Sequence, residues 1–359
     1  MWKCNGISAI LILVKGCVTL RMREKPMRIA LDAMGSDNCP VPDVEGACLA
    51  AREFGETILV IGDEKRIASE LAKHDTTGLK LEVVHASDAI TMEDKPGVVG
   101  KSKPNSSMHV GMNLVKSKQA DAFVTAGNTG AAMTIATLFT LGRIDKVKRP
   151  ALSSIIRVMN DRTIIMLDIG ANTDSKPEWL VQFAIMGQIY AQQALGLKNP
   201  KVALLSNGEE ETKGNQLIHD TSDLIKTSTM NFVGNIEPRE MLDGNADVIV
   251  SDGFVGNIAI KTLEAMGSTL FKLIRKEIKS DPIATVGGLL AQRAFRRVYR
   301  QIDPFEIGGA PLLGVDGVVI IGHGRSNAKA IKNAIGQARM AVKGDVIQSI
   351  SNGLKDLAE

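Results

Sequence analysis

Short apolar segments alternate with longer helical segments along most of this chain, and this alternation restricts the fold more than any other feature. The apolar segments are rich in branched side chains and have the length of single strands. They occupy residues 28–32, 58–61, 81–84, 122–125, 163–167, 202–205, 248–250 and 318–321. Strands joined through helices form parallel sheets covered on both faces. The sequence therefore predicts an α/β protein with a doubly wound, mostly parallel sheet.

Most of the predicted strands end at a glycine-rich turn. These turns occupy residues 126–131, 169–172, 206–209, 252–257 and 322–326. In such sheets ligands bind at the carboxyl ends of the strands. A single glycine requires no more than a positive φ, but the repeated Asn, Ser and Thr beside helix N-termini favour an oxyanion. We therefore expect several of these turns to line one crevice that binds phosphate or another oxyanion.

Length and charge restrict the class of protein further. At roughly 150 residues per domain, a chain of 359 residues with 44% hydrophobic content has room for about two lobes. Its 43 Lys and Arg are nearly balanced by 40 Asp and Glu. No overall positive field is present that would attract nucleic acid, and we predict no nucleic-acid partner.

The sequence also lacks the usual patterns for metals and cofactors. Its four cysteines, all within the first 48 residues, have no Cys-x-x-Cys spacing and no neighbouring His, which indicates reduced cytosolic thiols. No Gly-x-Gly-x-x-Gly follows the first strand, and the partial phosphate-loop pattern at 97–102 has Lys95 in place of its leading glycine. Asp32 and Asp37 flank the first turn without a further ligand, so capping is the simpler interpretation. We expect neither a metal nor a cofactor.

The first residues differ in character from the rest. The apolar run 7–14 is shorter than the roughly 20 residues of a membrane span, and no small-residue cleavage site follows it. A signal peptide is the alternative interpretation. We predict that 1–26 is an extension preceding a folded domain at 27–353, with Met22 or Met27 as the natural start.

Six segments in order resemble the signature segments of the PlsX family of phosphate acyltransferases. They are 32–37 (DAMGSD), 126–131 (AGNTGA), 167–172 (LDIGAN), 207–210 with 213–214 (NGEE and KG), 251–257 (SDGFVGN) and 308–314 (GGAPLLG). The likeness extends from about residue 27 to 350. Two departures are Ser36, where the family usually has a second glycine, and 101–104, which replaces a more basic stretch.

The resemblance implies a fold akin to isocitrate and isopropylmalate dehydrogenases and to phosphotransacetylases, with a protruding helical segment. It implies a homodimer that reversibly transfers a fatty acyl group from acyl-carrier protein to inorganic phosphate. The acyl phosphate product would pass to a membrane glycerol-3-phosphate acyltransferase for phospholipid synthesis. Such an enzyme is cytoplasmic and peripherally associated with the membrane.

This chemistry requires positioning rather than a catalytic triad. Phosphate is already an anion and a thiol with a pKa near ~8.5 is a good leaving group, so the site must gather the reactants and stabilise an oxyanion. The catalytic candidates are Asp252, Lys213, His323 and Asn257. The substrate-binding candidates are Asn128, Thr129, Gly130, Asn172, Lys261 and Ser326.

Each candidate also has a structural interpretation. Asn257 and Lys261 are four residues apart, so they share a helix face, but Lys261 is equally explained as a solvated lysine. Asp252 is equally explained as a helix N-cap. Lys213 follows three glutamates that would pair with it, and a single histidine such as His323 is often structural. Which residue acts as acid or base is left open.

The segment 289–302 predicts a basic amphipathic helix within a helical hairpin at about 262–303. Ala291, Ala294, Phe295, Val298 and Ile302 recur at helical spacing beside a separate arginine stripe. The predicted surface for a membrane or carrier protein comprises Leu289, Leu290, Arg293, Phe295, Arg296, Arg297 and Arg300. The segment 283–290, with its two glycines, is expected to form a flexible apolar tip. Packing on the core or on a dimer partner is the alternative.

Two other functions compete with acyl transfer. A phosphate-binding dehydrogenase of the same broad fold would require metal ligands that the sequence does not offer. A noncatalytic membrane scaffold would retain the arginine stripe but has no use for so many Gly-Asn turns. Acyl transfer to phosphate is therefore the function that the sequence favours.

Overall fold

The protein is described by a computed structural model that covers residues 9–14, 17–22 and 26–355. Its centre is an 11-stranded sheet in the order β10-β9-β11-β8-β7-β12-β13-β6-β3-β4-β5. The pairings are parallel in both outer blocks of this sheet and antiparallel at the three central junctions, between β13 and β12, β12 and β7, and β7 and β8. The predicted α/β class with a mostly parallel sheet is confirmed.

All the predicted strands are present in the two parallel blocks. One block contains β3 (Arg28–Asp32), β4 (Thr57–Gly62), β5 (Leu81–His85), β6 (Ala122–Thr125) and β13 (Val318–Gly322). The other contains β8 (Thr163–Leu167), β9 (Val202–Leu205), β10 (Phe232–Ile236) and β11 (Val248–Val250). Between them lie β7 (Ala151–Arg157) and β12 (Gly309–Leu313).

The three strands of the main sheet that the sequence did not predict have interrupted patterns. β7 carries Ser153 and Ser154 in its middle, and β10 contains Gly234. β12 contains Pro311, which is unusual inside a sheet because proline lacks an N–H donor. The Pro311 carbonyl still accepts a hydrogen bond from the Ser153 hydroxyl of β7, at 2.9 Å.

The antiparallel centre reverses the direction of the chain between the blocks. β12 runs antiparallel to β13 and to β7, and β7 runs antiparallel to β8. Strands of the β3 block and the β8 block therefore run in opposite directions. The carboxyl ends of the strands in one block, with the loops that follow them, lie at the opposite end of the sheet's strand axis from those of the other block: with the strands vertical, one set is above the strands and the other is below them.

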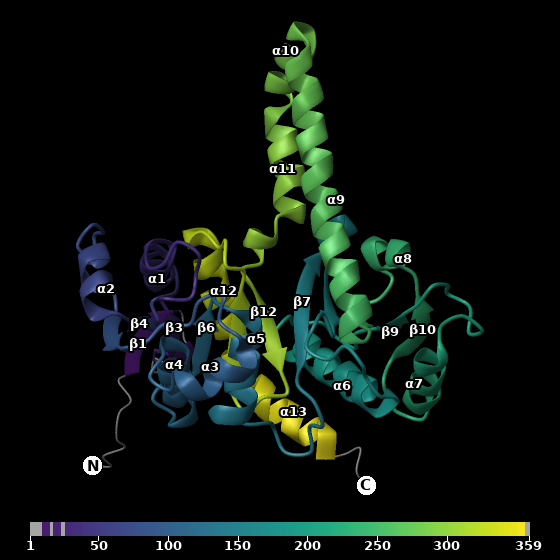
Figure 1. Cartoon of the computed structure of the whole chain (residues 1–359), viewed down its shortest axis with the longest axis horizontal. Coiled ribbons are helices and arrows are strands. Elements are labelled where there is room, and N and C mark those ends of the chain that lie inside the picture. The colour runs from purple at the N-terminus through teal and green to yellow at the C-terminus, as the bar shows by residue number, and fades with distance from the viewer. Residues whose placement is uncertain (1–8, 15–16, 23–25, 356–359) are drawn as a thin grey trace.

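Helices cover both faces of each block (Figure 1). In the β3 block one face is covered by α1 (Val41–Phe54), α2 (Glu64–Leu71) and α12 (Ala328–Lys343), and the other by α3 (Pro96–Ser102), α4 (Ser107–Lys116), α5 (Thr129–Thr134) and a π-helical turn at Ile135–Phe139. In the β8 block one face is covered by α6 (Pro177–Gln193), α7 (Gln216–Lys226) and α13 (Val346–Lys355), and the other by α8 (Pro238–Asp243) and the base of α9.

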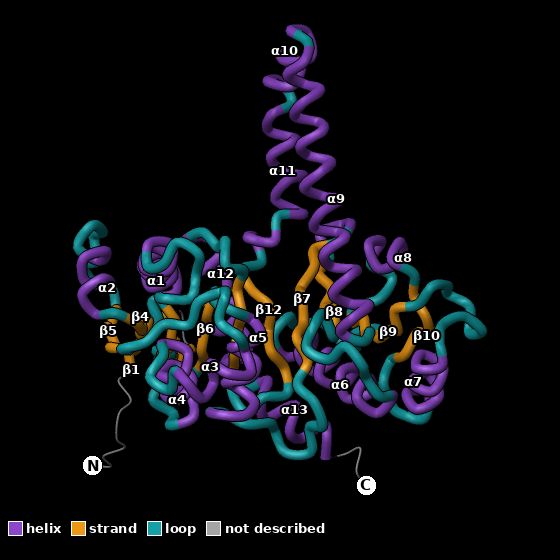
Figure 2. Tube along the Cα trace, in the orientation of Figure 1, coloured by secondary structure: helices purple, strands orange, loops and turns teal. Residues whose placement is uncertain are grey.

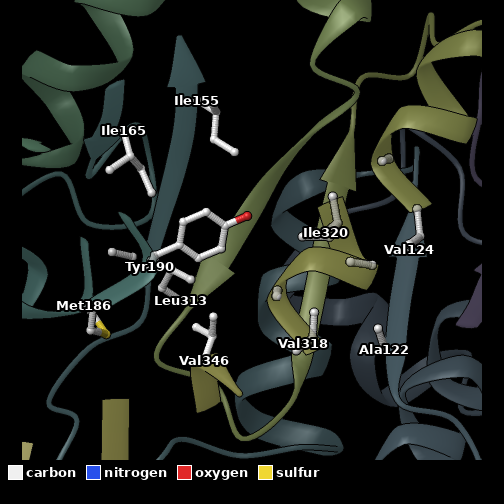
Figure 3. Packing of buried hydrophobic residues seen from close by; sticks show 14 of the residues in the cluster. Ala122, Val124, Ile155, Ile165, Met186, Tyr190, Leu313, Val318, Ile320 and Val346 are labelled. Carbon is white, nitrogen blue, oxygen red and sulfur yellow. The ribbon is translucent and has the colours of Figure 1, made fainter. Parts of the chain in front are cut away.

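Alternating strand residues supply the core on both faces. In β3, Ile29 and Leu31 join the cluster beneath α1 and α12, whereas Ala30 joins the cluster beneath α4. The first cluster continues across the centre of the sheet into the second block, where Tyr190 of α6 packs among Ile155 and Leu313 (Figure 3). This continuous core holds the two blocks together.

A helical hairpin projects from the sheet (Figures 1 and 2). It consists of α9 (Gly253–Ser280), α10 (Pro282–Leu290) and α11 (Gln292–Ile302). α9 begins earlier than the expected hairpin, and at ~1.5 Å per residue its 28 residues span about 42 Å. The segment expected to be a flexible tip is the helix α10, capped by Asp281, and the basic helix begins at Gln292 rather than Leu289. Among the described helices, none combines the length and apolar character needed to cross a membrane.

The described part of the N-terminal segment forms a separate hairpin. β1 (Ala9–Val14) pairs antiparallel with β2 (Cys17–Met22) and belongs to a two-stranded sheet distinct from the main one. Residues 1–8, 15–16 and 23–25 lie outside the described residues. That 1–26 precedes the functional domain stays a prediction.

Candidate active site

The loops at the strand ends form two groups because the two blocks run in opposite directions. The first group contains 33–37, 126–131 and 322–326, and the second contains 168–172, 206–214 and 251–257. Several of the turns expected to line one crevice therefore lie together in each group, but not all five lie in the same group. The element that connects the groups is α9, which starts in the second group and passes the first at the base of the hairpin (Figure 1).

The first group is held together around the buried Asp32. The Thr125 hydroxyl donates to its Oδ2 (2.8 Å), and the Met34 N–H donates to its Oδ1 (3.0 Å). A Cβ on Gly35 would lie 2.9 Å from the backbone nitrogen of Gly127, so the close approach of these loops requires glycine. Burial raises the pKa of Asp32 above its ordinary value. Asp32 therefore supports the loops and does not face a ligand.

Asn128 has the same supporting character. Its Oδ1 accepts from the Ala131 N–H (3.0 Å) and caps α5, while its Nδ2 donates to the carbonyl of Asp94 (3.0 Å) and to those of two residues nearby. Both ends of the amide are thus engaged within the protein. Thr129 is exposed beside it, and Gly130 packs closely on Pro96.

Asp168 organises the second group. Its carboxylate is buried and accepts hydrogen bonds from the backbone N–H groups of Leu152, Gly170, Ala171 and Asn172 and from the Asn172 side chain, at 2.7–3.1 Å. Burial raises the pKa of Asp168, and the hydrogen bonds from Ala171 and Asn172 oppose that shift. The Asn172 side chain also donates to the Pro150 carbonyl (2.8 Å). The predicted ligand Asn172 therefore has its amide nitrogen engaged, and only its Oδ1 is left for a substrate.

The start of α9 packs directly on this loop. The Gly253 N–H donates to the Asn172 carbonyl (2.8 Å), and a Cβ on Gly256 would overlap the carbonyl oxygen of Asp168. Asp252 is the N-cap of α9, since its Oδ1 accepts from the N–H groups of Phe254 and Val255 at 2.9 Å. Helix capping therefore accounts for the Oδ1 atom of Asp252 and does not involve its Oδ2 atom.

Asn257 and Lys261 line a cavity of about 530 Å³ on the outer side of α9. Its other walls are Thr173, Gly253, Phe254, Ile258, Thr262, Ala265, Met266 and Thr269. Asn257 is half-buried beside Gly170, and Lys261 is exposed and makes no ion pair within the described ranges. A cation and an amide on one helix face, one turn apart, form a suitable arrangement for an oxyanion.

His323 approaches the same helix from the first group. Its Nδ1 accepts from the Arg325 N–H (3.2 Å), so the neutral ring carries its proton on Nε2. Partial burial lowers its pKa, as do Arg325 and Lys261, whereas Glu264 and Asp37 raise it. His323 is therefore within electrostatic range of α9, with Nε2–H as a donor.

Two further candidates, Ser326 and Lys213, do not line the cavity of Asn257 and Lys261. Ser326 is buried, and its Oγ has no hydrogen-bond partner among the described residues. Lys213 is exposed on the 206–214 loop, where its carbonyl accepts from the Asn235 side chain (3.1 Å). In the described part of the chain it forms no ion pair with the preceding glutamates, and Glu211 pairs instead with Lys226 (3.1 Å). No contact joins the Lys213 side chain to the Asn257 and Lys261 cavity.

The predicted surface residues all lie on the outer hairpin. Leu289 and Leu290 of α10 are 70% and 82% exposed, and Ile283 beside them is 82% exposed. The four arginines of α11 are exposed, and Phe295 is half-buried against α9. The apolar tip and the basic stripe are therefore both accessible in this chain.

Sequence reasoning missed some residues of the site. Asp168 appeared only as part of a resembling segment, and nothing marked it as the acceptor of most hydrogen bonds in its loop. Glu264 and Arg325 were also missed, although Glu264 is three residues from Lys261 on one helix and Arg325 is two from His323. Spacing from a chosen candidate is the signal that would have found them.

Comparison with known proteins assigns the family. A family model described as "Fatty acid synthesis protein" matches residues 27–349. A phosphate acyltransferase from Dictyoglomus turgidum is 47% identical over 334 residues, covering 93% of this chain and 99% of the relative. This chain belongs to the phosphate acyltransferase family. One from Geobacter sulfurreducens is 44% identical over 329 residues, covering 92% of this chain and 94% of the relative.

Solved structures agree with the fold. A branched-chain phosphotransacylase from Enterococcus faecalis superposes with a TM-score of 0.56 at 16% identity, covering 88% of this chain and 99% of the other. A phosphotransacetylase from Streptococcus pyogenes gives 0.56 at 14% identity, covering 90% and 94%. The expected PlsX-family membership and phosphotransacetylase-related fold are confirmed. As a member of this family, the chain is an acyltransferase whose reaction involves phosphate and serves fatty acid and phospholipid synthesis.

Proposed function

We propose that this enzyme transfers a fatty acyl group from acyl-carrier protein to inorganic phosphate and releases acyl phosphate. A phosphate oxygen attacks the thioester carbonyl carbon, the carbon–sulfur bond breaks, and the carrier thiolate takes up a proton. The reaction is reversible. The observation that carries the proposal is that Asn257 and Lys261 line one cavity at the start of α9, with His323 within electrostatic range of Lys261, in a chain that shares its family with phosphate acyltransferases.

Each of the three residues has a role that suits the step. Lys261 supplies a cation for phosphate, and Asn257 supplies an amide donor one turn below it. A donor directed at a developing oxyanion is worth roughly 2.7–4 kcal/mol. The lowered pKa of His323 favours its neutral ring, whose Nε2–H is suited to donate a hydrogen bond to the departing thiolate, while the thiolate takes its proton from water. Asp252, which caps α9, holds this first turn in position.

The test is to mix the purified protein with hexadecanoyl-acyl-carrier protein, with and without inorganic phosphate. Acyl phosphate is trapped with hydroxylamine while free thiol is measured. Phosphate-dependent hydroxamate with equal release of thiol is the expected result. Thiol release without hydroxamate would indicate hydrolysis, and no reaction from folded protein would remove the proposal.

The hairpin supports two proposed contacts. The apolar tip of α10 is exposed at Ile283, Leu289 and Leu290, which suits insertion among the headgroups of an anionic membrane. The arginines of α11 suit an acidic carrier protein. We propose a cytoplasmic homodimer that binds the membrane peripherally and passes acyl phosphate to a membrane glycerol-3-phosphate acyltransferase.

Vesicle flotation separates these contacts. Leu289→Asp with Leu290→Asp is expected to reduce binding to phosphatidylglycerol vesicles at least tenfold, because charges then occupy the tip. Leu224→Asp, at another exposed leucine on α7, is the control. Arg296→Glu with Arg297→Glu is expected to raise KM for the acyl-carrier protein. Unchanged flotation of the leucine variant would exclude the tip, and unchanged KM would exclude the arginines.

A further inference from the structure

A second cavity of about 780 Å³ lies between α9 and α11, farther along α9 than Asn257. Its apolar lining comes from both helices: Leu263, Phe271, Ile274 and Ile278 of α9, and Phe295 and Tyr299 of α11. The rings of Phe271 and Tyr299 meet edge to face at 5.2 Å between centroids. At the base of the hairpin the lining ends in His323 and Arg325. We refer to this cavity as the hairpin groove.

The hairpin groove begins beside the proposed reaction site, because Lys261 of the first cavity and Glu264 of the groove are three residues apart on one helix. Lys261 lines the first cavity, and its charge acts on His323, which lines the groove. Glu264 lines the groove and also a smaller cavity of about 210 Å³ that extends toward β7. A molecule whose reactive end lies between Lys261 and His323 therefore has an apolar passage leading away along the hairpin.

Charge and length indicate what the groove accommodates. Lys272, Arg275 and Lys279 line it along α9, and Arg325 lines its base, so its cations outnumber the acids Glu264 and Asp303. The Asp303 carboxylate already accepts the Phe305 N–H (3.0 Å). From Leu263 to Ile278 the α9 wall extends about 22 Å at ~1.5 Å per residue. The apolar lining and this length match a long apolar chain, and Arg325 at the base suits an anionic end.

We propose that the hairpin groove binds the fatty acyl chain, with its reactive end at His323 and Arg325 and its tail directed toward α10. This inference rests on the proposed acyl transfer and adds the part of the site that measures chain length. Ile274 and Phe271, midway along the wall, are the specificity-determining residues. A short acyl chain ends below them, whereas a long chain passes between them and α11.

A second copy of this chain is a less suitable occupant. A two-fold contact through this face would gather Lys272, Arg275 and Lys279 of both copies in one interface, at a cost in repulsion. The exposed apolar side chains of α9, such as Ile258 and Met266, lie on its opposite face. The groove itself therefore has a lining suited to a lipid chain.

The test uses Ile274→Trp, which adds bulk inside the groove on a helix that stands outside the core. Glu277→Trp adds the same bulk to an exposed position of α9 that does not line the groove. Calorimetry measures the binding of hexadecylphosphonate and butylphosphonate, two chains with the same anionic end. Turnover is measured with hexadecanoyl- and butanoyl-acyl-carrier protein, and mass by light scattering.

We expect Ile274→Trp to weaken hexadecylphosphonate binding and to lower kcat/KM for the long acyl chain at least tenfold, with the short chain unchanged. Glu277→Trp should match the wild type in both. Equal effects on both chain lengths, or none, would overturn the groove while leaving acyl transfer intact. A change of mass in Ile274→Trp would assign the groove to a contact between copies and also overturn it. Length-dependent phosphonate binding without any turnover would support the groove and refute the proposed reaction.

Discussion

Asp43 of α1 is a fully buried carboxylate behind the loop that follows β3. Its Oδ2 accepts a hydrogen bond from the Ser36 hydroxyl at 2.5 Å, and its Oδ1 has no partner among the described residues. Burial raises its pKa to about 7, the Ser36 hydrogen bond opposes this shift, and the nearby Asp32 adds to it. Ser36, where the family usually has glycine, thus makes a contact that glycine cannot make.

This arrangement predicts how stability depends on pH. Because the folded pKa of Asp43 lies above the unfolded one, its favourable contribution is complete below about pH 4 and is lost as pH rises toward 7. Asp43→Asn is neutral at every pH and has a similar shape. Its stability relative to the wild type should therefore increase between these pH values, by roughly 4 kcal/mol at most, and stay constant above them. Urea unfolding at several pH values measures the difference, and a pH-independent difference would contradict the prediction.

Tyr190 is a second buried residue with an incomplete set of partners. Its side chain is fully buried in the central core, and its hydroxyl has no hydrogen-bond partner within the described residues (Figure 3). A buried hydroxyl without a partner costs about 1–3 kcal/mol. Tyr190→Phe removes the hydroxyl and keeps the ring, so we expect it to raise the free energy of unfolding by about 1 kcal/mol.

Chemical denaturation measures this change. Tyr190→Ala is the comparison, because it removes the ring as well and should lower stability by about 3–5 kcal/mol through the cavity it leaves. A loss of stability in Tyr190→Phe would mean that the hydroxyl has a partner in solution.

At the residue scale, the sequence predicted which side chains share a helix face better than it predicted how deeply a side chain is buried or which groups it contacts. Asn257 and Lys261 were predicted to share a helix face, and both line one cavity. The roles of Asp43 and Asp168 could not be predicted, because burial and hydrogen-bond partners depend on loops that meet only in the folded chain. The same applies to Asn128, whose amide suits a ligand as well as it suits the carbonyls that it contacts.

At the element scale, the start of α9 contains both a helix cap and residues of the proposed reaction site. The Asp252 carboxylate caps the helix through Oδ1, and Asn257 and Lys261 lie on the turns above it. Asp252→Asn retains the cap because Asn is as good an N-cap as Asp, whereas Asp252→Ala should lower stability by about 1 kcal/mol. We expect Asp252→Asn to keep wild-type stability and to lower kcat/KM at least tenfold, which corresponds to about 1.4 kcal/mol.

The two variants are compared by thermal unfolding and by acyl phosphate formation. Activity lost only in proportion to stability, with a fully active Asp252→Asn, would restrict Asp252 to capping. The pair therefore separates the two interpretations that the sequence left open.

The element scale also shows where prediction from the sequence ends. Most strands of the two parallel blocks have continuous apolar runs. The sequence predicted these strands, and all of the predicted strands are present in the structure. The serine, glycine and proline residues of β7, β10 and β12 interrupt such runs. Because β7 and β12 reverse the direction of the sheet, missing them also meant missing that the loops form two groups. The long helix α9 starts in one group and passes the other.

At the scale of the whole molecule, α9 presents different surfaces on opposite faces. The inner face lines the hairpin groove, and the outer face exposes Phe254 (59%), Ile258 (52%), Met266 (64%) and Leu273 (52%). Several large apolar side chains exposed on one helix face, referred to here as the apolar stripe, mark an interaction surface. We expect the proposed homodimer to form through it, and a second copy placed there would also close the outer side of the Asn257 and Lys261 cavity.

Light scattering at several protein concentrations tests this dimer. The wild type should have twice the 38.5 kDa mass of the chain, and Met266→Glu with Leu273→Glu should approach the mass of one chain because charges then face each other across the contact. Asp223→Lys, at an exposed position of α7, is the control and should remain dimeric. If the double variant keeps the wild-type mass, another surface forms the dimer, and if the wild type itself has the mass of one chain, the stripe must serve a different partner. Turnover measured on the same samples then shows whether the Asn257 and Lys261 cavity requires the second copy to be active.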